Sequence, residues 1–474
     1  MKTACTATPT SKIRTSKAQA LLGRALATLL VVATLAGACA SRVQSPFDSP
    51  AARSGQAGKP IVILVSLDGW RWDYLDRAQV PRLRALARAG VRAEGLIPPF
   101  PSKTFPSHYS IVTGLYPEHH GIISNNMLDA RIGERFSMDA PTSKDSRWWG
   151  GEPLWITAQK QGQIAAAMFW PGSDVEINGV RPKYWRLYDG EVPNRDRVQE
   201  VLKWLRLPEA DRPTFITLYF SDVDSVGHRA GPDSTEVLTA AADLDREIGA
   251  LVDGVNALRL SPLVNYVIVS DHGMSQTSLQ RLIPLDDYLD PATVELIDSS
   301  PVVGVWPRTI TVDAAYRALK DKHPALAVYK REDLPPELHF SSNPRIPPVI
   351  GIAADGWTVS TSAQAVQWQR SGRRMGGQHG YDPRLRSMHG LFIASGPQFR
   401  IGVTVPAFEN VHLYAMMCRV LGLSPAPNDG RADVTKDMFV QGQGSTSING
   451  GPRLQPGPSR HRLEPVPSIN SFVR

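Results

Sequence analysis

The residues that could carry chemistry begin with Asp68 and Thr104. Asp68 follows the apolar, β-branched run 61–67 and precedes a glycine. This pattern is typical of a buried strand that delivers a carboxylate to the edge of an α/β sheet where ligands bind. Thr104 lies in the run Pro-Ser-Lys-Thr-Phe-Pro-Ser-His at residues 101–108. A threonine hydroxyl alone is a poor nucleophile, but a divalent cation can lower its pKa enough for attack, so metal ligands are needed elsewhere in the chain.

A second candidate pair follows the apolar run 214–220. Asp224 and His228 are four residues apart, a spacing that places both side chains on one face of a helical turn, where they could bind one cation. Asp222 competes with Asp224 for this role because it lies two residues earlier in the same segment. The pair alone is a weak indication of a metal, since a capped helix start has the same pattern.

A third group follows the run 265–270, where Asp271 and His272 are adjacent and precede Gly273. Adjacent ligands can reach one cation only if the backbone turns sharply, which a glycine permits. A further histidine, His379, lies among glycines and would by itself be an ordinary loop residue. The conjunction is more specific, because carboxylates after three strands, three histidines and a hydroxyl match what two zinc-like ions need for an in-line displacement at phosphorus.

A sheet is needed to bring these side chains together. Apolar runs and helical periodicity alternate along the chain, which predicts an α/β fold with a largely parallel sheet covered on both faces. The further predicted strands are 164–169 and 391–395, and the predicted helices are 80–90, 195–206 and 237–258.

The first 40 residues predict export. Residues 1–40 contain five Lys or Arg, no Asp or Glu, and an apolar stretch that ends in small residues, which is the layout of a signal peptide. Cleavage after Ala40 predicts a periplasmic or secreted protein, whereas cleavage before Cys39 would leave a cysteine for lipid attachment. Leu35 lies one place too far upstream for the usual lipoprotein signal, and both outcomes stay open.

The rest of the chain is predicted to be one large domain between two flexible segments. Residues 41–58 are rich in Ser, Ala, Pro and Gly and predict a linker, residues 59–440 form the domain, and residues 441–474 predict a disordered tail. Within the domain, the alternation of apolar runs and helical periodicity is no longer regular in residues from about 275 to 375. They are predicted to form an inserted cap subdomain, and the alternative is a surface excursion with no role in binding.

The net charge of +7 does not indicate nucleic-acid binding. Five positive charges lie in the leader and a net three in the tail, so residues 41–440 are close to neutral. Of three cysteines, Cys418 alone lies in the body of the chain, so neither a disulfide framework nor a cysteine-based zinc site is expected. The predicted partner is a small molecule.

From about residue 59 to residue 433, the chain resembles the nucleotide pyrophosphatase/phosphodiesterase family (type I phosphodiesterases) of the alkaline phosphatase superfamily. The motifs that carry the resemblance are Leu67-Asp68-Gly69, Pro101-Ser-Lys-Thr104-Phe-Pro, Tyr116-Pro117 with His120-Gly121-Ile122, Asn125, Trp170-Pro171-Gly172, Asp224-Ser-Val-Gly-His228, Asp271-His272-Gly273-Met274 and His379-Gly380-Tyr381. The resemblance implies an alkaline-phosphatase-like α/β/α sandwich with a mostly parallel central sheet and an inserted cap subdomain.

The resemblance also implies a two-zinc site and a covalent mechanism. Thr104 would attack phosphorus to give a nucleotidyl-threonine, which water then hydrolyses to release a nucleoside 5′-monophosphate. Asn125 and the backbone NH of Phe105 would hold the non-bridging oxygen, and Phe105 and Tyr188 would stack on a nucleobase. The implied ligands are Asp224, His228 and His379 for one ion and Asp68, Asp271 and His272 for the other, with Thr104 between them. From composition alone, Asn125 would be a turn residue and Tyr188 a core residue.

Other functions compete with this one. A phosphonoacetate hydrolase or a choline-headgroup phosphodiesterase of the same superfamily would share the threonine and both metal sites, and a non-catalytic metal-bearing surface protein is the alternative from another class. Lys103, beside Thr104, could attract an anionic substrate or be a solvated loop charge. No arginine adjoins Thr104, which favours diesters over dianionic monoesters, unless Arg373 or Arg374 folds over the site.

Overall fold

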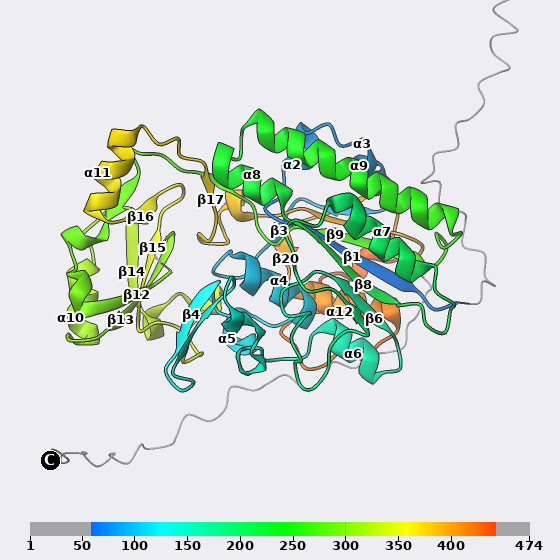
Figure 1. Cartoon of the computed structure of the whole chain (residues 1–474), viewed down its shortest axis with the longest axis horizontal. Helices are drawn as coiled ribbons and strands as arrows, with labels where there is room; N and C mark the ends of the chain where they lie inside the picture. Colours follow the sequence, from blue (N-terminus) through cyan, green and yellow to red (C-terminus); the bar gives the residue numbers. More distant parts are fainter. Residues whose placement is uncertain (1–57, 299, 442–474) are drawn as a thin grey trace, which may run out of the picture. The chain divides into compact units, whose positions relative to one another are not determined.

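The computed structural model describes residues 58–298 and 300–441 (Figure 1). The predicted leader lies outside this range, as do the linker and the tail except for Gly58 and Gln441. The extents of these segments and the other domain boundaries therefore stay predictions. Among the helices that the structure describes, none is both long and apolar enough to span a bilayer.

A mostly parallel sheet of eight strands lies at the centre of the domain (Figure 1). In spatial order the strands are β19 (Val403–Val405), β2 (Val91–Ala93), β18 (Phe392–Ser395), β9 (Val264–Val269), β1 (Ile61–Leu67), β8 (Phe215–Phe220), β6 (Ala165–Met168) and β7 (Tyr184–Trp185). β18 runs antiparallel to both of its neighbours, and the other neighbouring pairs are parallel. The sheet thus confirms the predicted fold class.

The three middle strands explain why the candidate carboxylates meet. β1, β8 and β9 are buried along their whole length, which is why their sequences are nearly continuous apolar runs. β1 pairs in parallel with β8 on one side and β9 on the other. Their carboxyl ends therefore open at the same edge of the sheet, where α/β proteins bind ligands.

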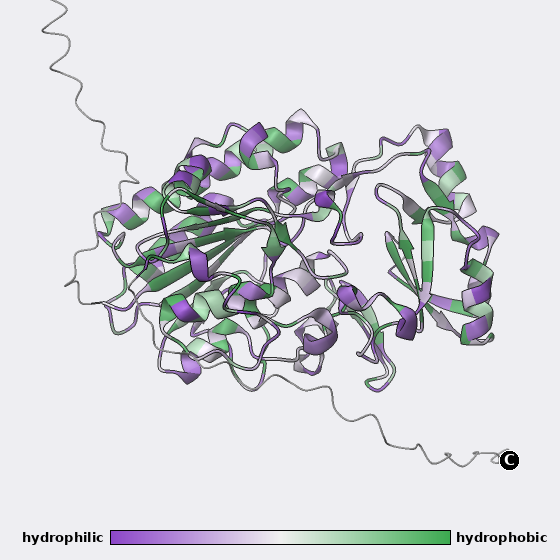
Figure 2. Ribbon diagram, turned by 180° about the vertical axis from the view of Figure 1, so that it is seen from behind, coloured by the Kyte–Doolittle hydropathy of each residue, from purple (hydrophilic) through white to green (hydrophobic). Residues whose placement is uncertain are grey.

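Helices cover both faces of the sheet (Figure 1). One layer consists of α2 (Tyr74–Arg77), α3 (Pro81–Arg88), α7 (Asn194–Leu205), α8 (Asp222–Ala230) and α9 (Thr235–Ala257), and the other of α4 (Thr104–Thr113), α5 (Pro117–His120), α6 (Leu154–Lys160) and α12 (His412–Leu421). Figure 2 shows largely hydrophobic central strands beside helices in which hydrophilic and hydrophobic residues alternate. Every strand and helix predicted from the sequence is present, with ends shifted by at most two residues. The predicted strands and helices are thus confirmed.

The predicted insertion forms a second sheet with its own apolar core. Its antiparallel strands are β12 (Val294–Ile297), β13 (Val302–Pro307), β15 (Val349–Ala353) and β14 (Leu326–Lys330), and α10 (Val312–Leu319), α11 (Ser362–Ser371) and the pair β11 (Leu282–Pro284) with β16 (Thr358–Ser360) complete it. β10 (Ser275–Gln276) pairs with β17 (Gly377–Gln378) where the chain leaves the central domain and returns. Two further two-stranded sheets join β3 (Leu96–Ile97) to β20 (Phe408–Glu409) and β4 (Asn126–Asp129) to β5 (Glu134–Ser137).

A buried arginine attaches the inserted subdomain to the central domain. The guanidinium of Arg345 donates to Asp129 at 2.8 Å and to the carbonyl oxygens of Gly121 and Trp148 at 2.8 and 2.7 Å. It also lies over the ring of Trp148 at 4.9 Å. Breaking a buried pair by removing one partner is strongly destabilising, so this contact fixes the subdomain against the turn that leads to β4.

Candidate active site

Thr104 is the first residue of α4, after Lys103 in an extended conformation. Its Oγ1 lies 3.4 Å from Nε2 of His272. The amide groups at the start of a helix have no partner within the helix, and the helix dipole is positive there. An anionic phosphoryl group is therefore favoured beside this hydroxyl.

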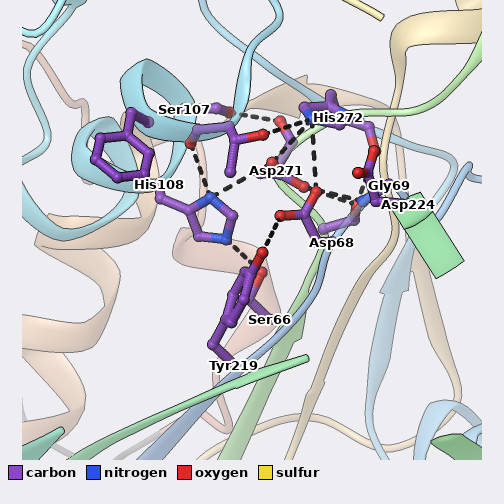
Figure 3. Close-up of polar contacts among 12 residues, drawn as sticks. Ser66, Asp68, Gly69, Ser107, His108, Tyr219, Asp224, Asp271 and His272 are labelled. Carbon is purple, nitrogen blue, oxygen red and sulfur yellow. Dashed lines mark hydrogen bonds and ion pairs between the residues drawn. The ribbon is translucent and has the colours of Figure 1, made fainter. Parts of the chain in front are cut away.

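The three predicted carboxylates converge at the edge where β1, β8 and β9 end (Figure 3). Asp68 follows β1, Asp271 follows β9, and Asp224 lies in the first turn of α8, which follows β8. Each has one buried oxygen that accepts no hydrogen bond from the described residues: Oδ1 of Asp68, Oδ1 of Asp224 and Oδ2 of Asp271. Buried carboxylate oxygens without partners are unfavourable, and a cation among them would satisfy all three.

Three histidines direct Nε2 toward these oxygens. In each ring Nδ1 lies within hydrogen-bond distance of a backbone carbonyl oxygen, which can only accept, so Nδ1 carries the proton and Nε2 has the free lone pair. The partners are Gly377 for His228 (3.0 Å), Gly273 for His272 (3.0 Å) and Ser102 for His379 (2.9 Å). A hydrogen bond of this kind orients the ring of a metal-binding histidine.

The donor atoms lie close enough to share cations. Asp224 Oδ1 lies 3.4 Å from His228 Nε2 and 3.7 Å from His379 Nε2. His272 Nε2 lies 3.0 Å from Asp271 Oδ2 and 3.6 Å from Asp68 Oδ1. The rings of His272 and His379 stack at 3.5 Å, so the two sets adjoin. The structure thus brings together Thr104 and all six residues predicted to bind metal.

His108 also lies in the site, although it belongs to none of the metal-ligand patterns in the sequence. By distance alone, Asp68, His108 and Asp271 form one candidate metal group, and Asp224, His272 and His379 form another. However, Nδ1 of His108 faces the carbonyl oxygen of Thr104 at 2.8 Å, so Nε2 must accept from Ser66 Oγ, also at 2.8 Å. His108 thus connects α4 to Ser66 on β1, and its Nδ1 lies 3.4 Å from Oδ2 of Asp271 (Figure 3). Its position one helical turn after Thr104 was the signal in the sequence.

Two hydrogen bonds hold the carboxylates of Asp68 and Asp271 in place. Tyr219 on β8 donates its hydroxyl to Oδ2 of Asp68 at 2.6 Å, and the NH of Gly69 donates to Oδ1 of Asp271 at 3.1 Å (Figure 3). Gly69 has a left-handed backbone (φ 67°), and a Cβ there would lie 2.7 Å from the Cα of Asp224. A glycine is thus required for α8 to approach β1. The sequence did not indicate a role for Tyr219 in the site, because a tyrosine in a strand is usually a core residue.

Gly273 is required by a close approach of another backbone segment. The sequence suggested a sharp turn that a glycine permits, and the Gly273 backbone is not in the left-handed region. Instead, a Cβ at this position would lie 2.1 Å from the carbonyl oxygen of Ser387. The glycine is needed because another backbone segment packs directly against it.

Burial and the closeness of three carboxylates shift the pKa values of the ionisable groups in the site. Burial raises the pKa of Asp68 well above its usual value, and the neighbouring Asp271 and Asp224 raise it further. Burial also raises the pKa of Asp224, and burial together with His272 lowers the pKa of His379 well below its usual value. Burial disfavours the charge on Asp271 too, but His272, His108 and His379 together outweigh burial and lower the pKa. Bound cations would compensate this excess of carboxylates.

The residues predicted to contact substrate lie around Thr104 and Asp68. The backbone NH of Phe105 donates to Oδ1 of Asn125 at 2.9 Å, so the turn that carries Asn125 adjoins the start of α4. The ring of Phe105 packs against Phe136 and Trp149. Tyr188 is 49% exposed and packs against Phe169 and Tyr219, the partner of Asp68. No aromatic contact joins Phe105 to Tyr188 among the described residues.

The charges near the nucleophile are already compensated. Lys103 is neither solvated nor free, because its Nζ lies 3.0 Å from a carboxylate oxygen of Asp298 and its side chain is 7% exposed. Arg373 lies over the ring of Trp368, and Arg374 donates to the carbonyl oxygen of Ala230. Neither of these contacts involves Thr104 or Lys103.

Solved structures show the same fold. The structure of human ectonucleotide pyrophosphatase/phosphodiesterase 5 has a TM-score of 0.76 and 37% identity, and the match covers 80% of this chain and 99% of that one. The fold is thus that of the alkaline phosphatase superfamily. The sequence profile of type I phosphodiesterase / nucleotide pyrophosphatase matches residues 62–382, and the chain belongs to this family. The resemblance stated from the motifs is thereby confirmed.

Curated relatives agree with this assignment. Human ectonucleotide pyrophosphatase/phosphodiesterase family member 5 is 38% identical over 379 residues, which cover 80% of this chain and 78% of the relative. A venom phosphodiesterase of Macrovipera lebetinus is 40% identical over 428 residues, or 87% of this chain and 48% of the relative. This chain therefore spans about half the length of the venom enzyme.

Proposed function

We propose that this protein hydrolyses phosphodiester and pyrophosphate bonds of nucleotides and releases nucleoside 5′-monophosphates. The observation that carries the proposal is the Thr104 hydroxyl at a helix N-terminus, 3.4 Å from Nε2 of His272. Close to that ring are three buried carboxylate oxygens that have no hydrogen-bond partner among the described residues. A structure of the murine phosphodiesterase 5 supports it, since that protein is described as an inactive threonine-to-alanine variant in complex with AMP.

Two zinc ions fit the donor set. The unpartnered oxygens and the three Nε2 atoms are the oxygen and nitrogen ligands that zinc binds. Asp224, His228 and His379 would hold one ion, Asp68, Asp271 and His272 the other, and Thr104 is proposed as a further ligand. When bound, the ions neutralise the carboxylates and the substrate phosphoryl group and lower the pKa of the Thr104 hydroxyl.

The chain's own groups carry the two displacements. Thr104 Oγ1 attacks phosphorus as the leaving group departs, which gives a nucleotidyl-threonine, and water then breaks the new ester bond. The NH of Phe105, expected to hold a non-bridging phosphoryl oxygen, instead donates to Oδ1 of Asn125 in this structure. Nδ2 of Asn125 is therefore the group that donates to that oxygen. Phe105 and Tyr188 are the proposed platforms for the nucleobase.

The site should prefer diesters to monoesters. The cation beside Thr104 is Lys103, which is paired with Asp298, so the second negative charge of a phosphomonoester lacks a free partner there. We expect kcat/KM for the nitrophenyl ester of a nucleoside 5′-monophosphate to exceed that for nitrophenyl phosphate by at least about a hundredfold, or about 2.7 kcal/mol of transition-state binding.

The comparison uses one zinc-loaded preparation of the mature chain, with a nucleoside triphosphate, a choline phosphodiester and phosphonoacetate as further substrates. Faster turnover of the choline diester than of any nucleotide would favour a headgroup phosphodiesterase, and turnover of phosphonoacetate alone would favour the corresponding hydrolase. Equal or reversed preference for the monoester would contradict the diesterase proposal. Bound zinc without any turnover would favour a non-catalytic surface protein.

The proposed location is outside the cytoplasm. It rests on the signal-peptide pattern of residues 1–40, which precede the described residues. A nucleotide phosphodiesterase in the periplasm or medium would meet extracellular nucleotides. Attachment of a lipid at Cys39 stays an alternative to free secretion.

A further inference from the structure

Asp298 of the inserted subdomain connects two loops of the active site. It follows β12, and its carboxylate faces Lys103, which precedes Thr104 in the chain. The same carboxylate accepts hydrogen bonds from Ser124 Oγ and, at 3.1 Å, from Nδ2 of Asn126.

The three donors lie next to the reacting groups. Lys103 directly precedes Thr104, and Ser124 and Asn126 stand on either side of Asn125. The side chains of Lys103 and Asp298 are 7% and 14% exposed, so their pairing is shielded from water. Burial alone would raise the pKa of Asp298, but Lys103 and the two hydrogen bonds outweigh burial and lower it. The carboxylate is therefore ionised at neutral pH.

We infer that Asp298 is a positioning residue, which holds the Thr104 loop and the Asn125 turn at the separation that catalysis requires. The inference rests on the proposed function for its catalytic consequence. Without Asp298 the two loops lose their common acceptor, and the Thr104 hydroxyl and the Asn125 amide are no longer held against the same phosphoryl group. Small displacements of such groups reduce rates strongly. The inserted subdomain thus contributes to catalysis through this carboxylate.

One hydrogen bond reports this separation without any substrate. The NH of Phe105 lies in the first turn of α4, where it has no partner within the helix, and it donates to Oδ1 of Asn125. Its hydrogen exchange therefore measures how firmly the Asn125 turn is held against α4. In Asp298→Ala we expect exchange at Phe105 to accelerate by at least about tenfold, with no change in β9.

Turnover provides the second measurement. For Asp298→Ala we expect kcat for a nucleotide diester to fall about tenfold to a hundredfold, while KM changes by less than about threefold. In an Asn125→Ala background, Asp298→Ala should lower kcat by a much smaller factor, because one of the two groups that Asp298 positions is already absent. Equal effects in both backgrounds would show that Asp298 does not act through Asn125.

The matched control is Asp313→Ala, which breaks the ion pair with Lys330 in the same subdomain and contacts neither loop. It should change neither exchange at Phe105 nor kcat. Because Asp298→Ala leaves Lys103 buried without a partner, Lys103→Met/Asp298→Leu provides a second variant without that charge. It should show the same faster exchange, since Ser124 and Asn126 still lose their acceptor.

Unchanged protection of Phe105 in both Asp298 variants, or an equal fall of kcat in Asp313→Ala, would overturn the inference. Faster exchange with normal kcat would overturn the catalytic role of Asp298. If the wild-type chain hydrolyses no nucleotide diester, the proposed function fails, and exchange at Phe105 still decides whether Asp298 holds the two loops.

Discussion

Replacing Thr104 by alanine should lower kcat for nucleotide diesters by at least about ten-thousandfold, as loss of a catalytic nucleophile does in other hydrolases. The side chain is only partly buried, and its hydroxyl makes one long contact, 3.4 Å to His272. Six stronger ligands remain for the metal. We therefore expect the variant to keep its fold and most of its zinc, which a thermal melt and metal analysis by mass spectrometry will check.

Thr104→Ser is the matched control for this variant. Serine keeps a hydroxyl at the start of α4 and removes one methyl group, so it should retain far more activity than alanine. Near-normal turnover by Thr104→Ala would exclude Thr104 as the nucleophile. Loss of zinc or of cooperative unfolding in that variant would show that the side chain is structural.

Removal of the metal should have an effect of similar size. Chelation should lower kcat/KM by at least about a thousandfold, and zinc should restore it, because activation of the hydroxyl and neutralisation of the phosphoryl group both depend on the ions. An unchanged rate after exhaustive chelation would contradict the metal assignment.

Asp224→Asn tests the assignment of ligands separately from activity. The substitution keeps the shape of the side chain but removes the charge whose Oδ1 lies between His228 and His379. We expect bound zinc to fall from two ions per chain to about one. Asp222→Asn is the control, since Asp222 accepts a hydrogen bond from Asn194 at 2.9 Å instead of facing the histidines. Equal zinc content in the two variants would contradict the proposed set.

The sequence predicted the central sheet and the convergence of the ligands for the same reason. Strands buried on both faces are nearly continuous apolar runs, and Asp68 and Asp271 directly follow two of them. Since those strands are parallel neighbours of one another, their last residues had to meet. The position of Asp224 required one further step, the helical spacing to His228.

The parts that the sequence did not predict depend on contacts between distant segments. His108, Tyr219 and Asp298 are ordinary helix, strand and loop residues in the sequence, and their partners lie far away along the chain. Lys103 could be interpreted as free or solvated because its partner Asp298 is 195 positions further on. The true reason for Gly273 is likewise a distant segment, at Ser387.

The stereochemical course at phosphorus tests the central claim, that Thr104 forms a covalent nucleotidyl intermediate. The zinc-loaded chain would hydrolyse a nucleotide phosphorothioate diester of known configuration in isotopically labelled water, and the configuration of the product would be determined. Two in-line displacements, first by Thr104 and then by water, predict net retention of configuration. Net inversion would mean that water attacks the substrate directly, which would contradict the covalent mechanism.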